Sequence, residues 1–406
     1  MGYPFLFLSK ISVPGFLDRN MIFRKAGITI RAFEMPVLLY AGENAFRRAI
    51  SRLLQKQNAK RVLYFTGSRG LKTVPSFPER ESLTEAVFPV KGEPDVQMVQ
   101  EALRFTGDFR PDVIISIGGG SVIDLAKAVS FLAGDENDIY YYYDHPNVLK
   151  ETIPHIAVPT TCGTGAEVMA NAVIRREDRK QSIRSASLRP YAALIDPFFT
   201  EALPLNVLIH SALDSLTQLI ESFVSNQANL LTDGICREGL RLFQKGFQVD
   251  RLSSLSAEER LDLQTAALLS GIALSNSRLG IVHGVASVLG GRTSMGHGEI
   301  CARFLRPFTG KNIEKAKAED EGLLEKYREV ACILGNRPDL SADDLPRILG
   351  NYENTLAKTK LTPLSFSERE GEEIAEASLA ASSTQGNPFR FTKEEVIEVF
   401  SSVQQS

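Results

Sequence analysis

Short apolar runs alternate with amphipathic helical patterns between Met35 and about Pro197. The runs are rich in β-branched residues, and their alternation with helical patterns predicts a parallel sheet covered by helices. The runs expected to form strands span residues 37–40, 61–66, 87–90, 112–117, 155–158 and 192–195. Apolar residues recur at helical spacing from Ala45 to Leu54, so this helix and the strands beside it form a βαβ unit. The polar segment from Arg175 to Lys180 indicates the turn of a hairpin.

The pattern changes after Pro197, where the strand signals stop. Long helical patterns then span residues 205–224, 233–248 and 257–276, and further helical segments follow Ala318. Ser256 and Glu259 fit a capping box for the third of these helices, in which each side chain bonds a free backbone amide. We therefore expect an α/β domain over residues 1–197 and an α-helical domain over residues 198–406.

Composition adds mainly exclusions. The 46 basic and 49 acidic residues give a net charge of −3. The sequence contains no stretch of basic residues with interleaved aromatics, so binding to nucleic acid or to an anionic membrane is not expected. The four cysteines are far apart and lack C-x-x-C spacing, which favours a reducing cytoplasmic location. The apolar segment at residues 4–8 is too short for a signal peptide and is expected to be an added strand.

Two glycine-containing loops follow neighbouring predicted strands. Gly118-Gly119-Gly120-Ser121 comes directly after an apolar strand and opens a helix, whose free amides and dipole attract phosphate. The second loop spans Pro159–Glu167, with the sequence PTTCGTGAE. Ligands of open parallel sheets bind at the carboxyl ends of the strands, so the pair predicts a nucleotide site. Each loop alone has a structural alternative, because tight turns between elements need glycine without any ligand.

The helical half carries candidate metal ligands. Asp214 and Gln218 lie four residues apart and project from one helix face. His283 and His297 follow in the glycine-containing segments GIVHG and GHG. A carboxylate and two imidazoles suit Zn²⁺ or Fe²⁺ and leave positions open for a substrate. A lone histidine more often has an ordinary structural role than a role as a metal ligand. The spacing of His283 and His297 alone therefore leaves both interpretations open.

Several segments together resemble the iron-containing (group III) alcohol dehydrogenase family, of the dehydroquinate synthase-like superfamily. They are GGGSVIDLAK at 118–127, PTTCGTGAE at 159–167, LIDPFFTEAL at 194–203, DSLTQLIESFVS at 214–225 and the two-histidine segment 280–298. Their order and spacing match the family over nearly the whole chain. The resemblance implies an N-terminal dinucleotide-binding α/β domain, an all-α C-terminal domain and a metal in the cleft between them.

The resemblance also implies roles for individual residues. Asp214, His283 and His297 match metal ligands and are the expected catalytic centre, and Gln218 occupies the position of the fourth ligand. The expected cofactor-binding residues are Gly67, Ser68, Gly118, Gly119, Gly120, Ser121, Asp124, Thr160, Thr161, Thr164, Asn171 and Lys180. The implied activity is hydride transfer between a nicotinamide cofactor and a small alcohol or aldehyde, in a homodimer or higher homo-oligomer.

The sequence departs from the family pattern at two positions near the metal. Gln218 stands where a histidine is usual, and its neutral amide binds a metal more weakly than imidazole does, so Zn²⁺ and Fe²⁺ are both open. Ser287 stands where many members have a proton-shuttling histidine. A relay through water or the cofactor ribose then has to serve, and His210, one turn before Asp214, is a second candidate carrier.

A third departure concerns the cofactor. NAD-selective relatives have an aspartate after the strand at 61–66, whereas this chain has Gly67, Ser68 and Arg69. A carboxylate would repel a 2′-phosphate, while glycine leaves room and the two polar side chains can donate to it. We therefore expect a preference for NADP(H) over NAD(H). A solvated role of Arg69 is the alternative.

Other functions remain open at this stage. A polyol dehydrogenase or a maleylacetate reductase-like enzyme would use the same residues on another substrate. A dehydroquinate synthase-like lyase shares the architecture, but its first metal ligand is usually glutamate, and Asp214 argues against it. Gln218 and Ser287 leave room for a non-catalytic homologue.

Overall fold

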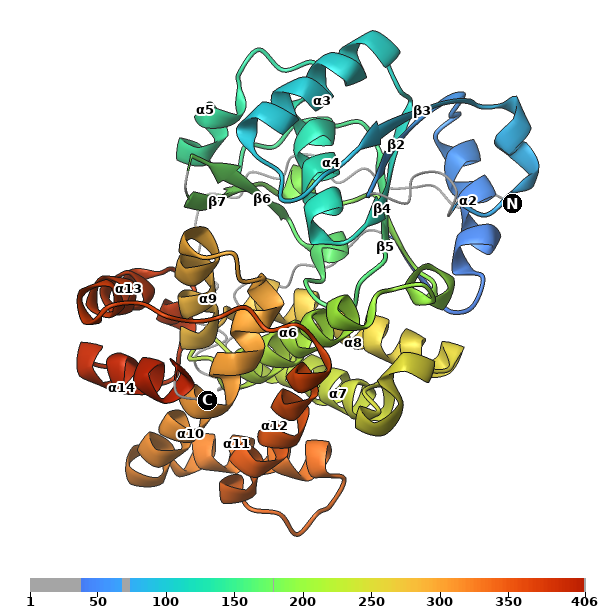
Figure 1. The fold of residues 1–406 in the computed structure, drawn as a ribbon. Helices are drawn as coiled ribbons and strands as arrows, with labels where there is room; N and C mark the ends of the chain where they lie inside the picture. The colour runs from blue at the N-terminus through green and yellow to red at the C-terminus, as the bar shows by residue number, and fades with distance from the viewer. Residues whose placement is uncertain (1–37, 68–73, 178, 405–406) are drawn as a thin grey trace, which may run out of the picture. The chain divides into compact units, whose positions relative to one another are not determined.

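The computed structural model describes residues 38–67, 74–177 and 179–404 of the chain (Figure 1). A parallel sheet has the strand order β1-β8-β5-β4-β2-β3. Its strands are β1 (Leu38–Ala41), β2 (Arg61–Thr66), β3 (Thr84–Pro89), β4 (Val113–Gly118), β5 (His155–Pro159) and β8 (Ala192–Ile195). The predicted strand at residues 4–8, as well as Ser68 and Arg69, lies outside the described residues.

Alternate residues of the strands pack on opposite faces of the sheet, because the side-chain period of a strand is two. Leu63 and Phe65 of β2 belong to a core with α3 (Val96–Phe109) and α4 (Gly120–Leu132). Val62 and Tyr64 belong to a core with α2 (Ala45–Lys56). Helices therefore cover both faces, which is why β2, β4, β5 and β8 are continuous apolar runs rather than alternating ones.

The predicted strands are confirmed, β2 and β8 with the predicted ends and the other four with shifted ends. The first two strands of the chain are not neighbours in the sheet. β1 pairs with β8, so β8, β5 and β4 lie between β1 and β2. The predicted hairpin is present as β6 (Asn171–Arg176) and β7 (Arg179–Arg184), and most of the polar segment is strand rather than turn. The four consecutive tyrosines form α5 (Ile139–Asp144), in which Tyr142 and Tyr143 are buried.

The remaining helices are consistent with the predicted helical half. They are α6 (Leu205–Val224), α7 (Leu230–Gly246), α8 (Ala257–Ser277), α9 (Ile281–Arg292), α10 (His297–Glu319), α11 (Glu321–Gly335), α12 (Leu345–Glu353), α13 (Glu368–Ala380) and α14 (Lys393–Gln404). The capping box of Ser256 and Glu259 is present. α7 begins three residues before its predicted start because Asn229 caps it and Thr232 completes a second capping box.

The helical half packs against the carboxyl ends of the strands. Gln264 of α8 donates to the carbonyl of Pro159, the last residue of β5, over 3.3 Å. Cys162, in the loop after β5, belongs to the apolar core built mainly by α6, α7 and α8. The described residues all belong to one compact unit, so the division at Pro197 stays a prediction. In the described chain, no single helix is long and apolar enough to cross a membrane; only the pair α8 and α9, bent by 103°, passes by length and composition.

Candidate metal centre and nucleotide loops

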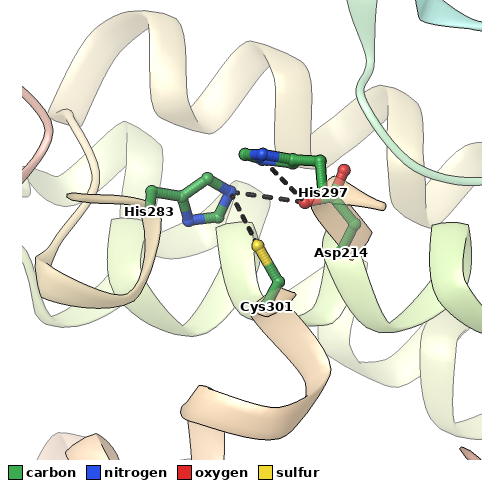
Figure 2. A group of neighbouring side chains, drawn as sticks. All are labelled: Asp214, His283, His297 and Cys301. Carbon is green, nitrogen blue, oxygen red and sulfur yellow. Dashed lines mark hydrogen bonds and ion pairs between the residues drawn. The ribbon is translucent and has the colours of Figure 1, made fainter. Parts of the chain in front are cut away.

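Four potential metal-binding side chains meet in the helical half (Figure 2). Asp214 lies in the middle of α6, His283 in the first turn of α9, and His297 and Cys301 in the first two turns of α10. One ligand atom from each lies within 4.8 Å of the others. The structure therefore brings together three of the four residues predicted to bind metal, Asp214, His283 and His297, and adds a cysteine.

The distances in this cluster suit a divalent ion. Asp214 Oδ1 lies 3.4 Å from His283 Nε2 and 3.6 Å from His297 Nε2. In a tetrahedral zinc site, metal–ligand bonds of about 2.0–2.3 Å place neighbouring donor atoms about 3.3–3.8 Å apart. Asp214 is 3% exposed, and its Oδ1 has no hydrogen-bond partner. An unpaired buried carboxylate oxygen is costly, and a bound cation would satisfy it.

Glu221 fixes the orientation of His283. The His283 Nδ1–H donates to Glu221 Oε2 over 2.6 Å, and the other carboxylate oxygen accepts from the Val282 amide over 2.7 Å. Glu221 therefore also caps the N-terminus of α9, whose own cap residue, Gly280, has no side chain. A carboxylate on Nδ1 keeps Nε2 available for a metal and raises its basicity, as in other carboxylate–histidine–metal arrangements.

The charges of the cluster favour a cation. Burial by itself raises the pKa of Asp214, but the neighbouring His297 and His283 lower it below its usual range. Burial lowers the pKa of His283, but Cys301 and Asp214 raise it well above its usual range. Burial raises the pKa of the Cys301 thiol to about 12. Negative groups surround His283, and positive charge at this point is stabilised.

A close contact between helices places His297 beside Asp214. A Cβ atom on Gly298 would lie 2.2 Å from the carbonyl oxygen of His210, which is one turn before Asp214 on α6. Only glycine therefore allows the start of α10 to approach α6 this closely. The predicted GHG segment owes its second glycine to this contact.

The other residues considered for the candidate metal site have hydrogen-bond partners of their own. The amide oxygen of Gln218, which is 4% exposed, accepts a hydrogen bond from the Ser270 hydroxyl over 2.6 Å. Ser287 donates to the Gly284 carbonyl over 2.8 Å. His210 lies 3.3 Å from the Thr359 hydroxyl, and burial lowers its pKa. The roles predicted for Gln218 and His210 stay predictions.

The two loops predicted to bind the nucleotide contact each other at adjacent strand ends. β4 and β5 pair in parallel, and the Thr160 amide donates to the Gly118 carbonyl over 3.0 Å. A Cβ atom on Gly120 would lie 3.0 Å from the Thr164 hydroxyl oxygen, so glycine permits this close packing. Ser121 is in the first turn of α4, whose capping residue, Gly119, offers no side chain to the free amides. These amides suit a phosphate.

Some predicted cofactor residues lie elsewhere or make structural contacts. Asp124 forms an ion pair of 2.8 Å with the buried Lys127 and accepts from the Val173 amide over 3.1 Å. Lys127 in turn donates to the Asn171 carbonyl at the start of β6. Lys180 is in β7, opposite Arg175. Gly67 follows β2, and a Cβ atom added there would meet no described residue within 4 Å.

Sequence reasoning missed Glu221 and Cys301 as members of this site. Glu221 is seven residues after Asp214, and Cys301 is four residues after His297, so each shares a helix face with a predicted ligand. A polar residue recurring on one face of the mostly apolar α6 was the signal for Glu221. For Cys301 the signal was weaker, since a buried cysteine is common in apolar cores.

The chain matches two family profiles over most of its length. Residues 36–197 match "Iron-containing alcohol dehydrogenase", and residues 208–404 match "Fe-containing alcohol dehydrogenase family, C-terminal". Among curated proteins, alcohol dehydrogenase 4 of Saccharomyces cerevisiae is 26% identical over 378 residues, which cover 91% of this chain and 98% of the relative.

Two further relatives extend this agreement. The 4-hydroxybutyrate dehydrogenase of Clostridium kluyveri is 30% identical over 303 residues, which cover 72% of this chain and 79% of the relative. A solved structure of 1,3-propanediol oxidoreductase superposes with a TM-score of 0.81 at 25% identity, covering 92% of this chain and 100% of the other. The expected architecture, an α/β half with a parallel sheet followed by a helical half, is confirmed.

Proposed function

Because this chain belongs to the iron-containing alcohol dehydrogenase family, we propose that it is a metal-dependent alcohol dehydrogenase that works as an aldehyde reductase. The reaction is hydride transfer between a nicotinamide cofactor and a small alcohol or aldehyde. The observation that supports it best is the buried Oδ1 of Asp214, which accepts no hydrogen bond and lies 3.4 Å and 3.6 Å from two imidazoles. Such a group is stabilised by a cation and is costly without one.

Asp214, His283 and His297 are the residues that would hold the ion, and Glu221 would hold His283 in the required tautomer. Zn²⁺ and Fe²⁺ both suit a carboxylate with two imidazoles. When bound, the metal acts as a Lewis acid that polarises an aldehyde carbonyl or lowers the pKa of an alcohol. Ser287 bonds the Gly284 carbonyl, so we assign the proton relay to water and the cofactor ribose rather than to this side chain.

The cofactor would lie on the two contacting loops. The amides at the start of α4 would face the pyrophosphate, and Thr160, Thr161 and Thr164 would bond the phosphates and ribose. Gly67 carries no charge, and a Cβ atom added there would meet nothing within 4 Å among the described residues, which supports a preference for NADP(H). The donors expected for this phosphate are Ser68 and Arg69.

Initial rates test the proposal. The full chain is stripped with a chelator, reloaded with Zn²⁺ or Fe²⁺, and assayed for absorbance loss of NADPH and NADH with a series of aldehydes. We expect activity only with metal and a higher kcat/KM with NADPH. A clear NADH preference would refute the cofactor assignment, and absence of turnover with either metal would refute the enzyme. The reverse reaction with alcohols, diols and hydroxy acids identifies the substrate class.

A second substrate class has specific support. Matching relatives include proteins named 1,3-propanediol dehydrogenase and 4-hydroxybutyrate dehydrogenase, so ω-hydroxy substrates belong in the assay. A dehydroquinate synthase-like lyase would leave the nicotinamide unchanged after turnover, so net NADPH consumption excludes it. We also propose a homodimer or higher homo-oligomer, which sedimentation of the purified protein measures.

A further inference from the structure

Cys301 lies in the wall of the metal site. It is fully buried on α10, one turn after His297, and its Sγ lies 3.9 Å from His283 Nε2 (Figure 2). Given the metal-dependent function proposed above, we infer that the Cys301 thiolate is the fourth protein ligand of the ion. The site is then built from one carboxylate, two imidazoles and one sulfur, a set of ligands that suits Zn²⁺.

The position of the sulfur fits this assignment. With zinc–nitrogen bonds of about 2.0–2.1 Å and zinc–sulfur bonds of about 2.3 Å, tetrahedral neighbours lie about 3.6 Å apart. The 3.9 Å between Cys301 Sγ and His283 Nε2 exceeds this value by a few tenths of an ångström. The distances of 3.4 Å and 3.6 Å from Asp214 Oδ1 to the two imidazoles do not exceed it. Asp214, which is 3% exposed and whose Oδ1 accepts no hydrogen bond, independently indicates a cation at the same point.

Gln218 is the competing candidate for the fourth position. Its amide oxygen, the only atom of the side chain that can bind a metal well, accepts from the Ser270 hydroxyl over 2.6 Å. The hydroxyl also lies 2.8 Å from the Ala267 carbonyl, so α8 anchors this pair. A neutral amide oxygen already engaged in a hydrogen bond is a weaker donor than a thiolate, which carries a full charge.

Charge and donor chemistry then decide which metal is favoured. Asp214 and a Cys301 thiolate supply two negative charges, which balance a divalent cation in a buried site. Thiolate is a soft ligand that selects zinc over hard or oxygen-preferring ions. A substrate oxygen would enter such a centre as a further ligand, and catalytic zinc sites do expand to five-coordinate.

The other cysteines differ in surroundings. Cys162 and Cys236 lie in an apolar core, and Cys332 is partly exposed on α11 near the carbonyls of Pro338 and Leu340. Cys301 alone belongs to the cluster of potential ligands found in the described part of the chain. Cys332→Ser is therefore a matched control for removal of a thiol outside the site.

X-ray absorption at the zinc edge tests the inference directly. We expect one sulfur at about 2.3 Å together with nitrogen and oxygen at about 2.0–2.2 Å in the zinc-loaded full chain. The sulfur signal is expected to disappear in Cys301→Ser and to persist in Cys332→Ser and Gln218→Leu. Cobalt substitution gives a second readout, because a thiolate–cobalt charge-transfer band should appear in the wild type and be absent from Cys301→Ser.

Metal affinity, measured by competition with a chelator, separates the two candidate ligands. Mutation of a residue that only hydrogen-bonds a metal ligand typically lowers metal affinity about 10–100-fold. Loss of a direct ligand should lower it at least as much, so Cys301→Ser should bind zinc about 100-fold more weakly than the wild type. Gln218→Leu should stay within about threefold of the wild type. If Cys301→Ser does not fold, the wild-type absorption spectrum still decides.

The outcomes distinguish this inference from the function it rests on. A loaded, active enzyme with nitrogen and oxygen ligands only would overturn the role of Cys301 and leave the dehydrogenase intact. Loss of zinc in Gln218→Leu but not in Cys301→Ser would do the same. A wild-type chain that binds no metal and turns over no aldehyde would overturn both.

Discussion

Gly298 is the position at which a single methyl group should damage the metal centre. In Gly298→Ala the new Cβ would lie 2.2 Å from the His210 carbonyl oxygen and 2.7 Å from its carbon. Real Cβ atoms essentially never approach closer than 3.0 Å, so α10 and α6 must separate by at least about 0.8 Å at this point. The displaced residues adjoin two of the proposed ligands, His297 on α10 and Asp214 on α6.

This displacement is large for a metal site. Ligand distances in functional sites hold to within about 0.2 Å, and misplacement by about 1 Å can cost about 100-fold in rate. We therefore expect Gly298→Ala to lower metal affinity at least about tenfold and kcat about 100-fold. Overpacking should also lower the free energy of unfolding by about 1–3 kcal/mol, partly offset by about 0.5–1 kcal/mol from replacing a helical glycine.

Gly310 provides the control on the same helix. A Cβ atom there meets nothing within 4 Å, so Gly310→Ala should keep metal affinity and raise stability by about 0.5–1 kcal/mol. Both variants are compared by denaturant unfolding of the metal-free protein, by chelator competition and by steady-state kinetics. Wild-type metal affinity in Gly298→Ala would refute the argument that this contact sets the ligand geometry.

Three further predictions use other parts of the site. Glu221→Ala removes the carboxylate that accepts from His283 Nδ1, so zinc affinity measured by chelator competition should fall about 10–100-fold. Unchanged zinc affinity in a folded variant would show that Glu221 does not orient His283 for the metal. Gly67→Asp should lower the ratio of kcat/KM for NADPH to that for NADH at least about tenfold, because the new carboxylate repels the 2′-phosphate. The uncharged Gly67→Asn should change this ratio less. Equal ratios in the two variants would contradict an electrostatic cause. Burial raises the pKa of Glu167 from an ordinary 4.5 to about 7, so the unfolded chain ionises first and the wild type loses stability as pH rises through this range. Glu167→Gln cannot ionise, and its free energy of unfolding relative to the wild type should therefore increase between pH 5 and pH 8; a pH-independent difference would mean that Glu167 does not titrate abnormally.

The local structure of this protein follows from its sequence to a large extent. The strand at Arg61–Thr66 and the helix at Leu205–Val224 have the predicted bounds, because the apolar period is unambiguous and each segment ends at a clear signal. The capping box at Ser256 is similarly local, since its partner is only three residues away. β3 begins at Thr84 rather than at the predicted residue 87, because its partly exposed residues give a weaker apolar pattern than those of the buried strands.

The candidate metal site was predictable only in part. Asp214, His283 and His297 were identified by their motifs, and the structure places them together. Cys301 and Glu221 were not identified from the sequence. A cysteine is common in an apolar core and a glutamate is common on a helix, so neither residue type by itself indicates a role at a metal site. Their roles depend on which side chains of other helices lie opposite them.

The sequence alone determined the order of the elements, the change from strands to helices and the residue types available for chemistry, because these depend on interactions between near neighbours in the chain. Tertiary structure decided the strand order that separates β1 from β2, and it decided which side chains meet at Asp214 Oδ1. Such contacts join segments about 70–90 residues apart, and their energies depend on burial and distance rather than on local pattern.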